Sequence, residues 1–275
     1  MAEGCTLQVF VSSTSVGVQM NFRTTLQLLC CAVLVSVGAV RAQTPASQTV
    51  RYAVVSAVGD QLTVVYARLQ TGSRLDRNYH DVTALPDNTL DRLVLRNVDA
   101  VVKRTGGAEV AALAAANKSL FTAQKDGLTG KQSSDAAVKA FAAALPPGGA
   151  DRLLLVLKHR AEARIPIREG VIGLGRLEGV GFYVDSETYL KSATTGNVGQ
   201  GFLAPFAYVR LVLADAEGRI IDERRVEAAR SFSIGDARDA LQPWEVLNAD
   251  AKVAVLDQLL KAEIEKALPG LLATK

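Results

Sequence analysis

The chain has 275 residues, of which 49% are apolar, and its 31 basic and 28 acidic side chains give a formal net charge of +3. That apolar share is sufficient for a buried core and excludes a chain that is disordered throughout. The small basic surplus and an aromatic content of 5% argue against nucleic-acid binding, which usually shows clustered basic residues interleaved with aromatics.

A secretory signal is the most specific feature of the N-terminal region. Met20 begins a short polar segment that carries Arg23, and an apolar run over 28–40 leads into the small residue Ala42. This order is typical of a signal peptide that is removed on export. The run is shorter than the roughly 20 residues that a membrane-spanning helix needs. We therefore expect cleavage after Ala42 and a periplasmic or secreted protein; the alternative is a protein anchored to the membrane by an uncleaved signal.

Residues 1–19 and every cysteine fall in the part that we expect to be absent from the mature chain. Residues 1–19 precede the signal (about residues 20–42) as an N-terminal extension or as sequence upstream of a true start at Met20, and we favour the second. The cysteines are Cys5, Cys30 and Cys31. The mature chain would therefore have no disulfide and no thiolate metal site.

The mature chain is predicted to begin with a flexible leader, residues 43–49, and then a β-hairpin. Two β-branched runs, 52–58 and 62–69, flank the pair Gly59-Asp60. Glycine supplies the positive φ that a tight turn between two strands needs. Residues 70–86 are polar and are predicted to be irregular.

The stretch VVSAVGDQL in this predicted hairpin resembles the first sequence block of the SGNH/GDSL hydrolases, in which a strand ends in Gly-Asp-Ser and the serine is the nucleophile. Here Gln61 stands at the serine position and has no hydroxyl to activate. The family's late Asp-x-x-His block is also missing, since the only histidines are His80 and His159. The hairpin explains Gly59-Asp60 better than a hydrolase block does.

Three helices are predicted to follow, because apolar residues recur at three- and four-residue steps. The first spans about 87–104, the second, rich in alanine, about 108–124, and the third 134–145. Ser134 is predicted to cap the third helix, and the sequence PPGG to end it.

The second half of the chain is predicted to be rich in strands. A buried strand is predicted over 151–165, which turns amphipathic after Leu157, and another covers 181–190. A hairpin is predicted to join 206–213 to 219–229, because a turn sequence at 215–218 separates two β-like runs.

A final amphipathic helix is predicted over about 248–268, closed by Pro269-Gly270. The order of elements predicts the α+β fold class: a largely antiparallel sheet built from hairpins, with about four helices packed on one of its faces. We expect a single domain over 50–272.

The glycine-rich stretch GVIGLGRLEGVG, residues 170–181, is predicted to be a loop between strands. A dinucleotide-binding loop needs a third glycine where Glu178 stands, and it must lead into a helix. The following sequence is β-like, and there is no Walker-type Gly-Lys-Ser/Thr. We therefore expect no nucleotide cofactor, and the residue spacings indicate no metal site.

Five residues are the candidates for ligand binding. His80 lies near Asp76 and Asp81 in a predicted surface loop. Arg164 and Arg168 continue a series begun at Arg160, which predicts a basic ledge able to contact an acidic partner. Tyr183 and Tyr189 belong to an aromatic group beside the Gly/Thr-rich loop 192–201, which predicts either a ligand groove or ordinary core. The candidates are His80, Arg164, Arg168, Tyr183 and Tyr189.

Because no nucleophile–base pair is recognisable, we expect no enzymatic activity and name no catalytic residue. The sequence favours an exported, non-catalytic cell-envelope protein that binds or supports an envelope component, either a protein or a polymer. The alternative is a periplasmic hydrolase or small-ligand-binding protein with a site near His80 or the 170–202 loops. Convergence of His80 with Asp76 and Asp81 in a pocket would favour the alternative, whereas an exposed edge strand would favour the binding protein.

The protein recovered from its native host should begin at Gln43 and lie in the soluble exported fraction. Intact mass and N-terminal sequencing of the fractionated cells would measure both. A protein that keeps residues 20–42 and stays with the membrane would instead be an anchored one.

Overall fold

A computed structural model of the protein describes residues 50–68, 78–106, 110–114, 118–146, 150–192, 195–236 and 240–274. The predicted signal peptide and leader lie outside these residues, and so does Asp76. The description below concerns the described residues alone.

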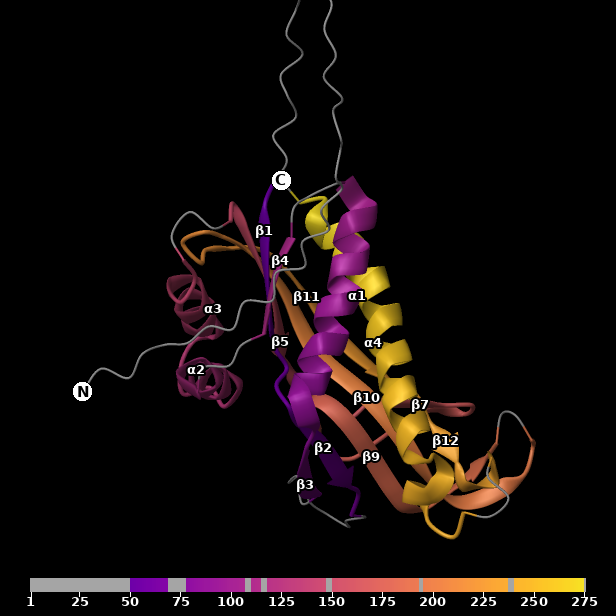
Figure 1. Ribbon diagram of the computed structural model, residues 1–275. Coiled ribbons are helices and arrows are strands. Elements are labelled where there is room, and N and C mark those ends of the chain that lie inside the picture. Colours follow the sequence, from indigo (N-terminus) through magenta and orange to yellow (C-terminus); the bar gives the residue numbers. More distant parts are fainter. Residues whose placement is uncertain are drawn as a thin grey trace, which may run out of the picture.

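The fold is α+β, as predicted, and its large sheet is mixed (Figure 1). The ten strands of this sheet are β1 (Tyr52–Ala57), β2 (Gln61–Tyr66), β3 (Tyr79–Ala84), β4 (Val110–Ala114), β5 (Arg152–Lys158), β6 (Arg160–Glu162), β9 (Arg176–Lys191), β10 (Val198–Asp215), β11 (Ile220–Ala229) and β12 (Phe232–Ser233). Their order is β3-β2-β9-β10-β5-β1-β4, with β11 and β12 also paired with β10 and β6 with β9. A small separate sheet joins β7 (Ile165–Ile167) to β8 (Gly170–Ile172).

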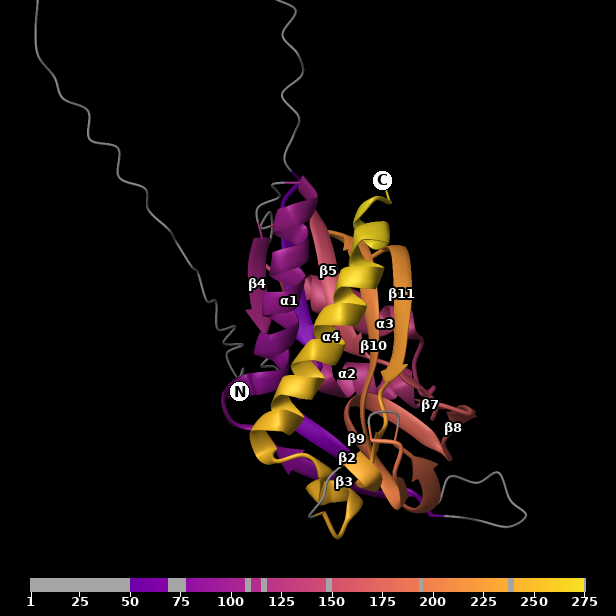
Figure 2. The ribbon, with the colours of Figure 1, turned by 90° about the vertical axis from the view of Figure 1, so that its right-hand side faces the viewer.

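Helices cover both faces of the sheet, so the prediction that they cover one face was wrong (Figure 2). The helices α1 (Thr89–Gly106) and α4 (Ala249–Leu272) pack together on one face, and α2 (Lys118–Leu128) and α3 (Ser134–Ala143) lie on the other. Three short 3-10 turns accompany them: Pro86–Asn88, Ile234–Asp236 and Pro243–Val246. The physical reason lies in strands such as β5, whose residues 153–157 are all buried and therefore need cover on both sides.

The predicted hairpin of β1 and β2 was wrong. β1 pairs in parallel with β4 and β5, while β2 pairs in parallel with β9 and antiparallel with β3. The apolar side chains of β1 point alternately to both helix layers, which suits a position between two strands, not a half-exposed hairpin. Gly59, with φ of 87°, still turns the chain, but it turns it toward a distant part of the sheet.

The strands β3 and β4 are among those that lie where none was predicted. β3 occupies part of the segment predicted to be irregular, and it pairs with the edge of β2. β4 occupies the start of the predicted second helix, and it pairs with the edge of β1, so α2 begins only at Lys118. Pairing along an open strand edge outweighs the helix propensity of an alanine-rich segment.

The ends of some predicted elements also shift. α3 is capped by Ser133, whose Oγ accepts the N–H of Ala136 at 3.3 Å, not by Ser134. α4 continues through Pro269 to Leu272, because the extra turn buries Leu271 at the cost of one helical hydrogen bond. The prediction of a loop over 170–181 was wrong for most of its length, because this stretch contributes β8 and the first part of β9, which begins at Arg176.

The strongest local patterns are confirmed. α1 and α4 follow their predicted apolar stripes, and β10 and β11 form the predicted antiparallel hairpin. Its turn is held by Asp215, whose Oδ1 accepts the N–H groups of Glu217 at 3.1 Å and Arg219 at 2.8 Å. These elements depend on residues close together in sequence, which is why the pattern identifies them.

Gly181 sets the closest approach in the sheet, where β9 pairs with β2 on one side and β10 on the other. A Cβ added at Gly181 would overlap the carbonyl oxygen of Thr63 and lie 2.9 Å from the ring of Phe206. Only a residue without a side chain lets these three strands come together.

Gly181→Ala should therefore lower the free energy of unfolding by about 3 kcal/mol or prevent folding. The matched control is Gly270→Ala in α4, where an added Cβ meets nothing within 4 Å and alanine should stabilise the helix by up to about 1 kcal/mol. Urea unfolding of both variants measures the difference. Equal stabilities for the two variants would contradict this packing.

Candidate functional site

The most unusual side chain of the sheet is Arg210, in the middle of β10. It is only 8% exposed, and its neighbours on the same face of the strand, Tyr208 and Val212, are buried as well. Arginine is rarely buried to this degree unless its charge is paired. Burial lowers the pKa of the Arg210 guanidinium from its ordinary value, but the group stays charged at neutral pH.

The pairing of Arg210 within the protein is incomplete. Its Nε lies 3.5 Å from Oε2 of Glu223, a distance that brings the charges together without a hydrogen bond. Glu223 also pairs with Arg225, at 3.1 Å. The Nε and Nη2 atoms of Arg210 are buried with no hydrogen-bond partner among the described residues.

A second arginine increases the local positive charge. Arg225 of β11 stands directly opposite Arg210 in the sheet register. Like charges in this position repel each other and destabilise a sheet. One carboxylate, Glu223, is shared between the two guanidinium groups, and Asp135 adds a weaker attraction to Arg210.

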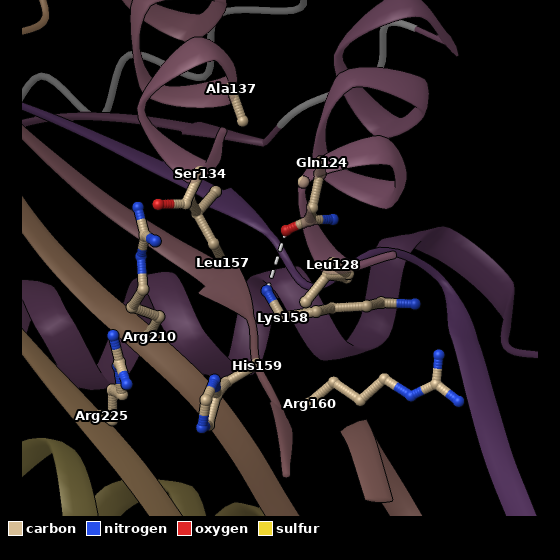
Figure 3. A pocket seen from close by; sticks show the side chains of 11 residues that line it. Gln124, Leu128, Ser134, Ala137, Leu157, Lys158, His159, Arg160, Arg210 and Arg225 are labelled. Atoms are coloured by element: carbon tan, nitrogen blue, oxygen red, sulfur yellow. Dashed lines mark hydrogen bonds between the residues drawn. The ribbon is translucent and has the colours of Figure 1, made fainter. Parts of the chain in front are cut away.

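A pocket of about 220 Å³ opens beside these arginines, and we call it the basic pocket (Figure 3). Its polar lining consists of Gln124, Ser134, Lys158, His159, Arg160, Arg210 and Arg225. Among the residues that the structure describes, no carboxylate is part of this lining. In Figure 3 the guanidinium of Arg210 points toward Ser134 at the start of α3, whereas Lys158 and Arg160 extend away from it.

The pocket lies at the carboxyl ends of the parallel strands β1 and β5, and Gln124 fixes this position. The Gln124 side chain is 5% exposed. Its Nε2 donates to the carbonyl of Ala57 at 2.9 Å, and its Oε1 accepts the N–H of Lys158 at 2.8 Å. One amide thus bridges the ends of both strands and ties α2 to them. In sheets with parallel strands, ligands commonly bind just outside these carboxyl ends.

His159 follows β5 directly and is held by one carboxylate. Its Nε2 lies 2.9 Å from Oε1 of Glu227, and its side chain is 15% exposed. The hydroxyl of Ser134 donates to Asp135 at 3.3 Å. The histidine and the serine of the basic pocket are therefore each engaged with an acidic residue and not with each other.

Two further pockets lie in the described part of the chain. One, of about 450 Å³, shares Gln124, Leu128 and Lys158 with the basic pocket, and we call it the α2 groove. The other, of about 230 Å³, is lined by Arg168 together with Lys191, Arg230 and Asp236, and we call it the Arg168 pocket.

The structure does not bring the five predicted ligand-binding residues together. His80 lies on the exposed edge strand β3, and Arg168 lines the Arg168 pocket. Arg164 is exposed, and its backbone N–H donates to the hydroxyl of Tyr208 at 3.0 Å. Their roles in binding stay predictions.

The two predicted tyrosines lie in different surroundings. Tyr183 is 1% exposed, its ring stacks on Phe202 at 6.0 Å, and its hydroxyl accepts the N–H of Leu174 at 3.0 Å. Tyr189 is 67% exposed, and its hydroxyl donates to Gln200 at 3.1 Å. Tyr183 is thus part of the core, and Tyr189 is a surface residue.

Arg210 was missed at the sequence level, although one signal pointed to it. It is the one charged residue in the apolar run 202–214. A charge at the centre of a strand buried on both faces indicates either an internal ion pair or a binding site. Only the fold shows that its pairing is incomplete.

A buried carboxylate supports the same end of the sheet. Asp91, in the first turn of α1, is 1% exposed. Its Oδ1 accepts the hydroxyl of Ser56 at 2.5 Å and the N–H of Gly59 at 3.1 Å. Burial raises the pKa of Asp91 to about 6, against the opposing effect of these hydrogen bonds.

Within the described ranges, no group of three or more His, Cys, Asp or Glu residues is placed to hold a metal ion. No helix among the same residues is long and apolar enough to cross a membrane. The comparisons with known proteins add no assignment: no family model matches the chain, and no curated protein matches it.

Asp91 should make the stability of the protein depend on pH. Because its pKa is about 6 in the folded protein and near 3.8 otherwise, the folded state binds this proton more tightly. The stability from that proton is fully present below about pH 4 and is lost as the pH rises through about 6. Relative to Asp91→Asn, the wild-type protein should lose about 3 kcal/mol of unfolding free energy over this interval.

Urea unfolding of both proteins at several pH values measures this difference. The variant serves as the control, because all other titrating groups are common to both proteins. A difference that stays constant between about pH 4 and pH 7.5 would contradict the raised pKa.

Proposed function

We propose that the protein is exported to the periplasm or secreted, and that it works there as a non-catalytic binding protein of the cell envelope. The basic pocket is the site that we assign to this function, and its ligand is an anionic group of an envelope component. The signal-like segment over about residues 20–42 supports the export, and the side chains around Arg210 support the binding.

The observation that carries this proposal is the pair of unpartnered N–H groups on Arg210. The Nε–H and one Nη–H of a guanidinium point in parallel, and together they match the two oxygens of a carboxylate or phosphate. A buried guanidinium without such acceptors costs free energy. An anion in the basic pocket, which Arg210 lines, would supply the missing acceptors.

The surrounding charges favour the same ligand. Arg225, Lys158 and Arg160 add positive charge around a lining in which none of the described residues is a carboxylate. The first turn of α3 also faces the pocket through Ser134 and Ala137, and helix N-termini attract anions. A bound anion would offset the repulsion between Arg210 and Arg225 that Glu223 offsets only in part.

The same geometry favours binding over catalysis. The hydroxyl of Ser134 and the imidazole of His159 would be the natural nucleophile and base of the pocket. Each is paired with an acidic residue instead, Ser134 with Asp135 and His159 with Glu227. A nucleophile must lie within hydrogen-bond reach of its base to be activated.

The position of His80 also supports a binding protein. All six residues of β3 are exposed, and β3 forms the end of the sheet order beside β2. An exposed edge strand with Tyr79 at 53% and Val82 at 51% exposure is a surface on which another chain can add a strand. His80 and Asp81 lie on this edge and line none of the three pockets described above.

A small-ligand-binding protein or hydrolase with its site near the 170–202 loops is the second candidate. The Arg168 pocket favours it, because Arg168 and Lys191 lie there beside Asp236. Asp236 is engaged, however, since it accepts the hydroxyl of Ser192 and the N–H of Ser233. Arg230 lies over the ring of Phe232 at 5.0 Å. Among the described residues that line this pocket, no buried side-chain atom lacks a hydrogen-bond partner, so this candidate comes second.

Calorimetric titration of the purified protein with inorganic phosphate tests the two candidates together. Wild-type protein should bind phosphate, and the affinity should fall as salt is added. Arg210→Met should abolish the binding, whereas Arg168→Met should leave it unchanged. Loss of binding in Arg168→Met instead would favour the second candidate, and absence of binding in the wild-type protein would contradict both.

Arg210→Met also has an expected effect on stability that separates binding from folding. Methionine is shorter than arginine but keeps an unbranched apolar stem and carries no charge, and Glu223 keeps Arg225 as its partner. The free energy of unfolding should therefore stay the same or rise by about 1–2 kcal/mol. A variant that loses both phosphate binding and several kcal/mol of stability would indicate a structural role for Arg210.

A further inference from the structure

The basic pocket continues into a second hollow, the α2 groove. The two share Gln124, Leu128 and Lys158 as a common wall. The α2 groove, at about 450 Å³, is the larger of the two. A ligand that fills both would place one group beside Arg210 and the rest of its body along α2.

Lys158 lies at the junction between the two hollows. Its stem packs over Gly179, where an added Cβ would come within 3.1 Å of the Lys158 Cδ. Figure 3 shows the Lys158 side chain extending away from Arg210 and passing Leu128. The lysine ammonium is therefore presented to the α2 groove, while the two arginines remain at the other end of the basic pocket.

The lining of the α2 groove differs in chemistry from that of the basic pocket. Asp60 and Glu178 provide acceptors, and Lys125, Lys158 and the hydroxyl of Thr63 provide donors. Phe121 is half-buried and contributes an aromatic ring to the same wall. This mixture of carboxylates, ammonium groups, hydroxyl and aromatic ring suits an uncharged body that carries many hydroxyl groups.

The charges of the α2 groove disfavour other chemical classes for the part of the ligand that lies there. Asp60 and Glu178 balance the charges of Lys125 and Lys158 there, so the groove attracts a second phosphate or carboxylate less than the basic pocket does, which disfavours a polyphosphate. An acyl chain would leave these carboxylates and the lysines without water or partners, which is costly. A hydroxylated ring can bond to both kinds of group and place its C–H face on Phe121.

We propose that the ligand is an acidic sugar, a sugar unit that carries one carboxylate or phosphate. Its anionic group lies beside Arg210 and Arg225 in the basic pocket, and its sugar ring lies in the α2 groove against Phe121. This inference rests on the proposed function, because it assigns the body of the ligand whose anionic group Arg210 binds. No bond is made or broken.

Calorimetric titrations of the purified protein with glucuronate, glucose 6-phosphate, glucose and inorganic phosphate test the assignment. At least one of the two acidic sugars should bind at least about tenfold more tightly than phosphate. Glucose should bind weakly or not at all, because it lacks the anion. Arg210→Met should abolish the binding of acidic sugar and phosphate alike.

Two variants of the α2 groove separate the sugar from the anion. Phe121→Ala and Thr63→Val should each weaken the binding of the acidic sugar, by about tenfold and about threefold, and leave phosphate binding unchanged. Thr63→Val conserves side-chain volume, so it keeps the test valid if loss of the Phe121 ring impairs folding. Arg92→Met, on the exposed surface of α1 at the opposite face of the sheet and outside the lining of both hollows, is the control.

The outcomes distinguish failure of this inference from failure of the proposed function. Phosphate bound as tightly as both acidic sugars, or affinities that do not respond to the Phe121 and Thr63 variants, would overturn the acidic sugar and leave the anion site in place. If neither phosphate nor acidic sugar binds, both the acidic sugar and the anion site are overturned.

Discussion

A strand that is buried on both faces has no room for an unpaired charge, and β10 meets this condition over most of its length. Every residue from Gly201 to Ala214 is buried, with α4 contacting one face and the opposite face contributing to the two other apolar clusters. Arg210 interrupts this run at the boundary between those two clusters. The arrangement of α2, α3, β5 and β11 around it produces a basic pocket at a place where packing alone would favour an apolar side chain.

Gln124 links the basic pocket beside Arg210 to the ends of β1 and β5. The strands β1 and β5 run in parallel and in register until Ala57 and Leu157, and then they diverge. The Gln124 amide continues the hydrogen-bonding pattern for one more step, from Ala57 to Lys158. By doing so it holds α2 against the strand ends and forms the wall that the two hollows share. Asp91 satisfies the neighbouring backbone at Gly59, so this end of the sheet is stabilised by two buried polar side chains.

Local sequence patterns account for part of this architecture. The apolar stripes of α1 and α4, the continuous apolar run of β5 and the turn residues of the β10–β11 hairpin are each defined within a few residues. The pairing partners of β1, β2 and β4 are not defined locally. Strands that pair in parallel come from distant segments of the chain, so a stretch of a few residues does not show which strands will pair. The hairpin prediction failed for this reason: Gly59-Asp60 indicates a turn, but not which strands lie beside it.

Local sequence patterns could not predict the basic pocket, for a related reason. Gln124, Ser134, Lys158, Arg210 and Arg225 come from five separate elements, and no spacing relates them. The predicted candidates were chosen as polar or aromatic residues in or beside predicted loops and on predicted strand faces, whereas Arg210 lies inside the long buried run of β10. A charged residue within an apolar run was visible in the sequence, but its two unpartnered N–H groups depend on where Glu223 and Arg225 lie.

The central claim is that the guanidinium of Arg210 takes its missing acceptors from an anionic ligand. The most direct measurement is the ¹H–¹⁵N NMR signal of its side-chain Nε–H, assigned by its absence in Arg210→Met, during a titration with inorganic phosphate. The account predicts a saturable downfield shift of this signal as the Nε–H gains a charged acceptor. A signal that does not move while phosphate is added would show that Glu223 already satisfies Arg210, and it would contradict the account.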